Sequence, residues 1–163
     1  MRWYGGKKGS YHLGILMMNE IVLKTATIED TLQVYVWQCL PETRRYANNP
    51  EVPTWEHHQA WMLKKLESQY DFFYMVYKGG LRVGVVRLDF CSSNRFLLSI
   101  FMCPKYHGQG LAKRTLAAID MMHPDIEINA RVLEANVASQ ALFKAAGYNK
   151  EKRNLFTKNK IEK

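Results

Sequence analysis

The 163-residue chain contains few cysteines, and their arrangement excludes several classes of protein. Cys39, Cys91 and Cys103 form no Cys-x-x-Cys pair and no Cys/His spacing typical of a zinc site, and no secretory leader precedes them. Long apolar runs are also missing. One of the longest, Leu97–Cys103, is far shorter than the roughly 18 residues that are needed to span a bilayer. We therefore expect a cytoplasmic protein with reduced thiols, no metal site and no membrane segment.

Most of the net positive charge lies at the two ends of the chain. The formal net charge is +8, and residues 1–19 and 151–163 contribute +3 each. Residues 20–150 hold 15 basic and 13 acidic side chains, which argues against a broad basic surface for nucleic acid. We expect no nucleic-acid partner for the domain.

The composition predicts one globular domain, since 47% of the residues are hydrophobic and 23% are charged. We expect residues 1–19 to be an arm or the remnant of an upstream module, residues 20–157 the folded domain and residues 158–163 a basic tail. No internal repeat interrupts this division.

Local patterns predict the element order β-α-α-β-β-β-α-β-α-β, an α/β (α+β) class with one mixed sheet and helices on both faces. The expected strands cover residues 20–26, 72–78, 81–90, 96–102, 125–132 and 148–157. For the first helix, capped by Thr27, the recurring apolar residues are Ile28, Leu32, Tyr35, Val36 and Cys39. For the second helix, capped by Thr54, the residues available for burial are Trp61, Leu63 and Leu66.

A glycine loop lies between the strand at 96–102 and a helix at 111–122. It contains His107, Gly108, Gln109, Gly110, Leu111 and Ala112, with Lys105, Lys113 and Arg114 around it. Two close glycines and the free amides of a helix start suit a pyrophosphate. The loop lacks the Gly-Lys-Ser/Thr ending of a P-loop, and it follows an antiparallel meander rather than the first strand of a dinucleotide fold. An ordinary turn with surface bases fits these residues equally well.

Two segments taken together resemble the GCN5-related N-acetyltransferase (GNAT) superfamily. His107-x-x-Gly110-x-Ala112 is similar to the family's acetyl-CoA loop, Gln/Arg-x-x-Gly-x-Gly/Ala, with histidine in the first place. Residues 136–148 are similar to its Asn-x-x-Ser-x-x-Leu-Tyr/Phe-x-x-x-Gly-Phe/Tyr segment. The resemblance covers residues 20–157 and implies a sheet of about seven strands that are mostly antiparallel. It also implies an enzyme that moves an acetyl group from acetyl-CoA to a primary amine.

The resemblance also implies where acetyl-CoA binds. The loop from His107 to Lys113 would hold the pyrophosphate, and backbone groups near Phe101 and Met102 would bond the pantetheine between two splayed strands. Asn136 and Ser139 would touch the pantetheine arm. Without the resemblance, Asn136 is an ordinary helix N-cap and Ser139 a first-turn serine.

The N-terminal half resembles a narrower group, the acetyltransferases that modify amino sugars on nucleotide carriers in pseudaminic and legionaminic acid biosynthesis. The similar stretches are residues 36–38, 41–46 and 54–61. The implied acceptor is an amino-deoxy sugar linked to a nucleotide, with Trp37 or Tyr46 stacking on the base. Arg44, Arg45 and His58 are matched in charge to the pyrophosphate, and the spacing of the resemblance favours Arg45 and His58. Trp37 and Trp61 fit a core role equally well.

The catalytic groups remain open at the level of sequence. Relatives that use a general acid place a tyrosine where this chain has Phe143, and a phenyl ring donates no proton. The acid is then Ser139, a water or another residue. For the base, Asp89 and His58 are the candidates, with Glu134 a third and a water chain a fourth; Asp89 also fits a solvent-facing strand end.

Two other functions compete with this interpretation. One is a protein or peptide N-terminal acetyltransferase of the ribosomal-protein alanine acetylase type, which shares the His-x-x-Trp pattern of His58 and Trp61. The other is a nonenzymatic module that binds CoA, a nucleotide or RNA. The oligomeric state stays open, a homodimer included.

Overall fold

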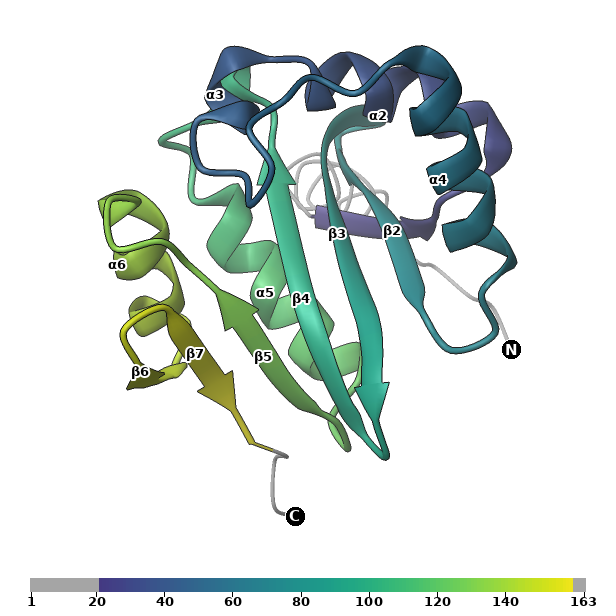
Figure 1. Cartoon of the computed structure of the whole chain (residues 1–163). Helices are drawn as coiled ribbons and strands as arrows, with labels where there is room; N and C mark the ends of the chain where they lie inside the picture. Colours follow the sequence, from purple (N-terminus) through teal and green to yellow (C-terminus); the bar gives the residue numbers. More distant parts are fainter. Residues whose placement is uncertain (1–20, 160–163) are drawn as a thin grey trace, which may run out of the picture.

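The computed structural model describes residues 21–159, which form one seven-stranded sheet in the order β1-β2-β3-β4-β5-β7-β6 (Figure 1). The strands are β1 (Ile21–Thr25), β2 (Phe72–Lys78), β3 (Leu81–Ser92), β4 (Arg95–Met102), β5 (Glu127–Arg131), β6 (Asn149–Lys152) and β7 (Leu155–Lys158). Neighbouring strands are antiparallel except β4 and β5, which are parallel. The predicted mixed, mostly antiparallel sheet is confirmed.

Helices cover both faces of the sheet, as the sequence predicts (Figure 1). They are α2 (Thr31–Gln38), α3 (Pro41–Arg44), α4 (Trp55–Glu67), α5 (Leu111–Met122) and α6 (Val137–Ala145), with short 3-10 turns η1 (Ile28–Asp30) and η2 (Pro104–Tyr106). Successive side chains of β2 alternate between two cores. Phe73 and Met75 pack with α2 and α4, whereas Tyr74 and Val76 pack on the side of α5 and α6.

The buried face of the first helix differs from the predicted one. Residues 27–30 form a 3-10 turn closed by a bond from Thr27 N–H to Asp30 Oδ2 (2.9 Å), and α2 buries Val34 and Trp37 instead. Three residues of the predicted face are exposed: Ile28 (59%), Leu32 (62%) and Val36 (48%). The prediction was wrong because apolar spacing gave too little weight to Trp37, whose large ring gains most from burial.

The second helix also differs in part. On α4, His58 and Met62 are buried one turn apart, while Leu63, predicted to be buried, is 48% exposed. Thr54 caps this helix as predicted, because its hydroxyl accepts a bond from His57 N–H (3.3 Å). The α5 residues Leu111, Leu116 and Ile119 are buried.

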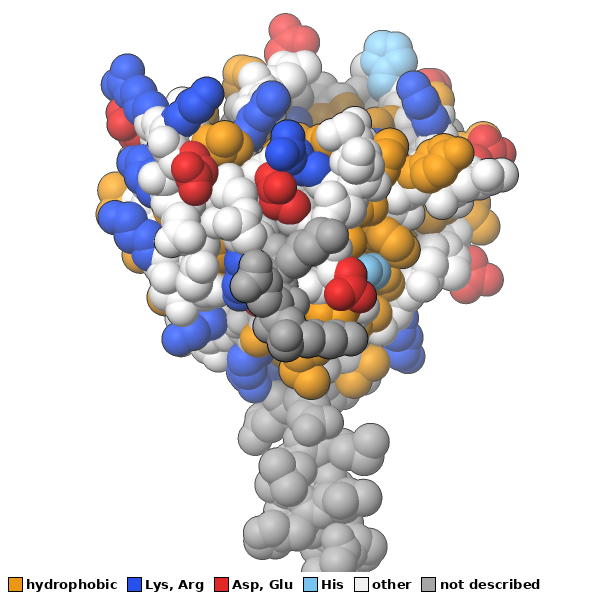
Figure 2. Space-filling view, turned by 90° about the horizontal axis from the view of Figure 1, so that it is seen from below, with side chains coloured by type: hydrophobic (Ala, Val, Ile, Leu, Met, Phe, Trp, Pro, Cys, Tyr) orange, Lys and Arg blue, Asp and Glu red, His pale blue; other side chains and the backbone are white. Residues whose placement is uncertain are grey.

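The predicted last strand, residues 148–157, is a hairpin. It turns between β6 and β7, and β7 inserts between β5 and β6. Lys158, predicted to begin a basic tail, belongs to β7 and pairs with Asp120. Lys and Arg side chains gather on this side of the molecule, next to α6 (Figure 2). The predicted arm at 1–19 and the end of the tail at 160–163 lie outside the described residues.

None of the helices between residues 21 and 159 has the length and apolar character needed to cross a membrane.

Candidate functional site

Strands β4 and β5 separate before β4 ends. Their parallel ladder runs from the Arg95–Glu127 pair to the Leu98–Ala130 pair, and β4 continues to Met102 with only β3 beside it. β5 bends toward β7, where the Val132 amide bonds the Asn154 carbonyl (2.9 Å). Figure 1 shows the two strands diverging toward the end of the sheet at which α5 and α6 begin.

The last residues of β4 present a free backbone edge to this gap. Cys103 N–H donates to the Val83 carbonyl (2.9 Å), so the alternation of an antiparallel ladder turns the amides and carbonyls of Ile100 and Met102 away from β3. Of these groups, the Met102 carbonyl is bonded by His107. Such an edge accepts a ligand with its own amides as an extra strand. Across β4, Gly84 permits close approach of β3, because a Cβ there would lie 2.3 Å from the Phe101 carbonyl oxygen.

The glycine loop connects this edge to α5. Gly108 (φ 76°) and Gly110 (φ 68°) adopt left-handed conformations, and a Cβ on either would meet no atom within 4 Å. The first bond of α5 runs from Arg114 N–H to the Gly110 carbonyl (3.2 Å), so the amides of the preceding helical residues have no acceptor within the helix. These residues are Leu111, Ala112 and Lys113. Open space in front of free amides suits a phosphate.

Side chains around the loop shape it further. His107 Nε2 lies 2.9 Å from the Met102 carbonyl and therefore donates to it, tying the loop to the end of β4. Lys78 Nζ donates to the Gln109 side-chain oxygen (2.8 Å), and Arg114 Nη2 donates to the Gln109 carbonyl (3.1 Å). Lys113 is exposed beside the free amides. The fold thus surrounds the predicted pyrophosphate loop with positive charge.

The α6 start lies at the same end of the sheet, because the carboxyl ends of parallel β4 and β5 point the same way. Asn136 caps α6 by accepting a bond from Ser139 N–H on its side-chain oxygen (3.1 Å), as its N-cap position predicts. Ser139 is half-buried. The structure therefore brings both sequence motifs to the gap between β4 and β5.

A cleft of about 580 Å³ lies on the other face of the sheet, between α2, α3 and α4. The residues that line it are Gln38, Arg44, Asn49, Glu51, Val52, Pro53, Thr54, His57, His58 and Trp61. The Trp37 ring, next to Gln38, packs on Phe101 of β4 (centroids 5.7 Å apart). The Trp37 ring, rather than a residue that lines the cleft, makes this contact with β4.

His58 is the predicted site residue that lines this cleft. Its side chain is buried among the rings of Tyr35, Trp55 and Trp61. Nε2 lies 3.1 Å from the Thr31 carbonyl, so Nε2 carries the hydrogen and Nδ1 keeps a lone pair. Burial lowers the pKa of His58, which favours the neutral ring. No residue between 21 and 159 supplies a hydrogen-bond partner for Nδ1.

Two residues predicted to bind substrate lie elsewhere. Trp37 is 6% exposed within the core, so its ring has no open face for a base to stack on. Arg45 is exposed over the Tyr46 ring (5.3 Å) and does not line the cleft. Its neighbour Arg44 lines the cleft instead, because Pro41 starts a single helical turn that directs Arg44 inward.

Asp89 is held in an ion-pair network rather than left as a solvent-facing strand end. Arg87 donates to both carboxylate oxygens (2.8 to 3.0 Å), and Lys65 Nζ lies 2.6 Å from Oδ1 and 3.0 Å from Asp71. Both oxygens of the Asp89 carboxylate are therefore already bonded to cations within the fold. The geometry favours a structural role for Asp89.

Phe143 belongs to the core and is 3% exposed. Its ring packs on Tyr148 (5.0 Å) and Phe156 (5.8 Å). The structure thus supplies no hydroxyl at the position where relatives place tyrosine.

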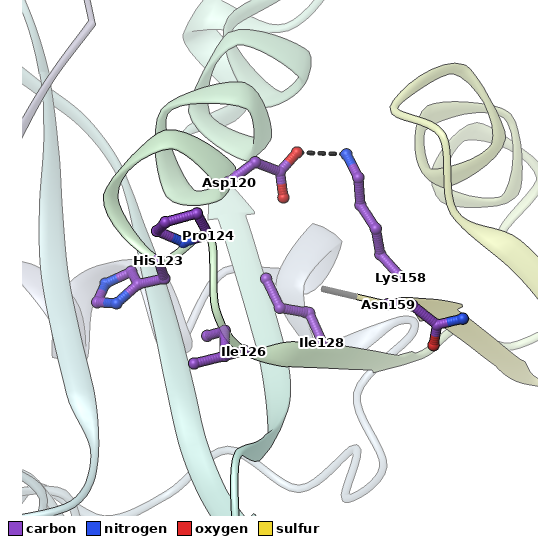
Figure 3. Close-up of a pocket in the computed structure, with 7 residues that line it drawn as sticks. All are labelled: Asp120, His123, Pro124, Ile126, Ile128, Lys158 and Asn159. Carbon is purple, nitrogen blue, oxygen red and sulfur yellow. Dashed lines mark hydrogen bonds and ion pairs between the residues drawn. The ribbon is translucent and has the colours of Figure 1, made fainter. Parts of the chain in front are cut away.

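A second cavity, between α5, β5 and β7, has room for about one water molecule (about 10 Å³). Figure 3 shows Asp120 and Lys158 closing it through their ion pair, with His123 and Pro124 beside them. It is too small for an acceptor. Within residues 21–159, no three His, Cys, Asp or Glu side chains gather as metal ligands would.

Sequence reasoning missed three cleft residues, Gln38, His57 and Trp61, and it ranked Arg45 above Arg44. The sequence gives little indication that these residues share a site, because only the folded chain brings the end of α2 beside α4. The density of polar and aromatic residues in 54–61 was the one available indication.

Solved acetyltransferase structures are similar to this fold. The ribosomal L7/L12 alpha-N-protein acetyltransferase RimL, in complex with coenzyme A, superposes with a TM-score of 0.76 at 12% identity, covering 86% of this chain and 94% of that one. The aminoglycoside acetyltransferase AAC(6')-Ib, with coenzyme A and kanamycin, gives 0.75 at 13% identity over 86% and 95%. Spermidine N-acetyltransferase from Vibrio cholerae gives 0.71 at 15% identity over 85% and 92%.

Among curated protein sequences, none matches the chain significantly. The profile of the acetyltransferase (GNAT) domain matches residues 20–149, which is most of the chain. This match favours an enzyme over a nonenzymatic binding module, and the free β4 edge and glycine loop fit acetyl-CoA as co-substrate. The chain belongs to the acetyltransferase (GNAT) domain family and is an acetyl-CoA-dependent N-acetyltransferase.

Proposed function

We propose that the acceptor of this N-acetyltransferase is the primary amine of a nucleotide-linked amino-deoxy sugar. The observation that carries the proposal is the cleft of about 580 Å³ between α2, α3 and α4. Its volume lies in the range of pockets that enclose ligands of several hundred daltons. A simple alkyl amine would leave much of it empty, whereas a sugar with a nucleotide carrier would fill it. The resemblance of residues 36–61 to nucleotide-sugar acetyltransferases supports the same acceptor.

In this proposal the two halves of the site have separate tasks. Acetyl-CoA supplies the acetyl group as a thioester. The amides of Leu111, Ala112 and Lys113 bind its pyrophosphate, and the Ile100 and Met102 edge holds the pantetheine. The same edge offers amide N–H groups to the thioester oxygen, where negative charge develops during transfer.

We assign the proton acceptor to His58. The amine nitrogen must be neutral to attack the thioester carbon, and the neutral His58 ring presents an unpaired Nδ1 in the wall of the cleft. A carbon–nitrogen bond then forms, the carbon–sulfur bond breaks, and the nitrogen's proton passes to Nδ1. The leaving thiolate takes a proton from Ser139 or from a water, since Phe143 donates none.

A second candidate acceptor is a peptide N-terminus. It is favoured by the similarity to RimL, which is named for acetylating ribosomal L7/L12 and has a TM-score of 0.76. A peptide end also fits an open cleft beside a strand edge.

A substrate screen tests the proposal. CoA release is measured with the full chain, acetyl-CoA, and four acceptors: a UDP-linked amino-deoxy sugar, an alanine-started peptide, spermidine and kanamycin. We expect the highest kcat/KM with the UDP sugar. Acetylation of the peptide without acetylation of the sugar would replace the first acceptor by the second.

A further inference from the structure

Arg44 is a half-buried cation in the cleft whose polar partners are all uncharged. Its Nη1 donates to the carbonyls of Asn49 and Glu51 (3.2 Å each), and its Nη2 donates to the Gln38 side-chain oxygen. Its Nε is buried and has no partner among the described residues. The guanidinium therefore keeps an unused donor as well as its full charge.

Three other half-buried cations between residues 21 and 159 are neutralised, whereas Lys78 bonds the neutral side-chain oxygen of Gln109. Arg87 lies 2.8 Å from Asp89, Lys65 lies 2.6 Å from the same carboxylate, and Lys158 pairs with Asp120. Arg44 forms no ion pair with any carboxylate between residues 21 and 159. Burial lowers the pKa of Arg44, which reflects the unfavourable desolvation of its charge. A buried charge without a counter-charge is destabilising unless a ligand supplies one.

The position of Arg44 gives a ligand access to it. Arg44, Gln38 and Asn49 all line the cleft that the proposed acceptor occupies. Gln38 presents a neutral oxygen to the guanidinium, and an anionic oxygen in that place would form a stronger, charge-assisted bond. The planar guanidinium also matches the geometry of phosphate and carboxylate.

We propose that Arg44 is an oxyanion subsite, and that the acceptor carries a phosphate or carboxylate group that displaces the Gln38 side chain from the guanidinium. This inference rests on the proposed function, because it assigns the cleft to the acceptor. It narrows the acceptor to amines with an anionic group on the same molecule. Arg45, one residue away, takes no part, since it is exposed and lies outside the cleft.

Calorimetry with the full chain tests the subsite. CoA is kept at saturation so that the glycine loop is filled, and inorganic pyrophosphate and succinate are titrated separately to distinguish phosphate from carboxylate. We expect one of them to bind the wild type, and Arg44→Gln to weaken that binding about tenfold or more. Arg45→Gln is the matched control and stays within about twofold of wild type.

A second variant guards against misfolding of Arg44→Gln. Gln38→Glu places a carboxylate on the guanidinium from within the chain, so it is expected to raise the melting temperature while also weakening anion binding about tenfold. Wild-type protein that binds neither anion, or a Gln38→Glu variant that binds like wild type, would overturn the subsite. Anion binding through Arg44 without acetylation of the UDP sugar would overturn the nucleotide-sugar proposal alone.

Discussion

The two halves of the proposed active site differ in the groups that build them. The CoA half consists mainly of backbone: the Ile100 and Met102 edge, two left-handed glycines and the first amides of α5. The acceptor half consists of side chains from segments far apart in sequence, from Gln38 through Arg44 to Trp61. The ligand of the CoA half is therefore determined by backbone conformation, and the ligand of the acceptor half by the identity of the side chains.

This difference has a functional consequence. A site made of backbone groups suits acetyl-CoA, the co-substrate that every reaction of the family shares. Its side chains can be substituted as long as the turns and the strand edge keep their conformation. A side-chain cleft can change its substrate through a few substitutions without altering the sheet. We therefore expect variants of the two halves to separate cleanly in their effects on acetyl-CoA and on the acceptor.

The largest expected effect is on the acceptor half, at His58. Replacing His58→Gln removes the Nδ1 lone pair, and we expect kcat/KM for the acceptor to fall about 100-fold. The KM for acetyl-CoA stays within about twofold, because separate elements bind it. Steady-state kinetics with each substrate varied in turn provides the measurement.

His57→Gln is the control, since His57 also lines the cleft but is exposed. The pH profile distinguishes a base from a packing role: wild-type kcat/KM declines in acid as the ring is protonated, and this limb disappears in the variant. Equal losses for both substrates would show that His58 only supports the fold.

The next effect lies in the CoA half, at Gly110. Gly110→Ala forces a Cβ into a left-handed conformation at about 1 kcal/mol, and this strain falls on the residue directly before the free amides of α5. We expect the KM for acetyl-CoA to rise about tenfold with the acceptor KM unchanged.

Gly80→Ala is a matched control for this variant. Gly80 has φ 80° and equally open surroundings, but it sits in the β2–β3 turn. Both variants are expected to lose similar stability, and only Gly110→Ala to lose affinity for acetyl-CoA. If Gly80→Ala raised the KM as much, general loosening of the sheet would explain both.

The contrast between a site of backbone groups and a site of side chains also determines how much of each half could be predicted from the sequence. Glycines at a fixed spacing before a helix, and an Asn-x-x-Ser helix start, are local patterns, so the glycine loop before α5 and the Asn136 cap of α6 were placed correctly in the fold. The sheet followed from strand alternation and short turns. Only the split of the last strand into β6 and β7 was missed, because Arg153 and Asn154 are a weak turn signal.

The acceptor half was predicted poorly for a physical reason. Which of Arg44 and Arg45 faces the cleft depends on where the turn of α3 begins, and a shift of one residue rotates a helical side chain by about 100°. Trp37 was assigned to the ligand because aromatic residues serve both cores and stacking surfaces. Its burial is decided by contact with Phe101, from a strand more than sixty residues away.

A smaller effect on stability and kcat is expected from a substitution in the core, at Phe143. Phe143→Tyr adds a hydroxyl next to Tyr148 and Phe156, and burying it without a partner destabilises the fold by about 1 kcal/mol. We expect kcat to stay within about threefold, because the ring points into the core. Urea unfolding and steady-state kinetics measure the two quantities. A marked rise in kcat would mean that the new hydroxyl reaches the leaving sulfur.

The smallest expected effect is a pH dependence of stability that reaches beyond the site. Burial lowers the pKa of both His58 and His123 below the ordinary histidine value of about 6.5. The unfolded chain therefore takes up protons before the folded chain does, and the free energy of unfolding declines as the pH falls below about 6.5.

His123→Phe keeps a ring against Phe72 (4.4 Å) but cannot titrate, so its unfolding free energy should fall less steeply between pH 7 and pH 5. Urea titrations at several pH values measure the slope, with the exposed His57→Gln as control. A slope equal to that of wild type would assign the pH dependence to His58 and hence to the acceptor half alone.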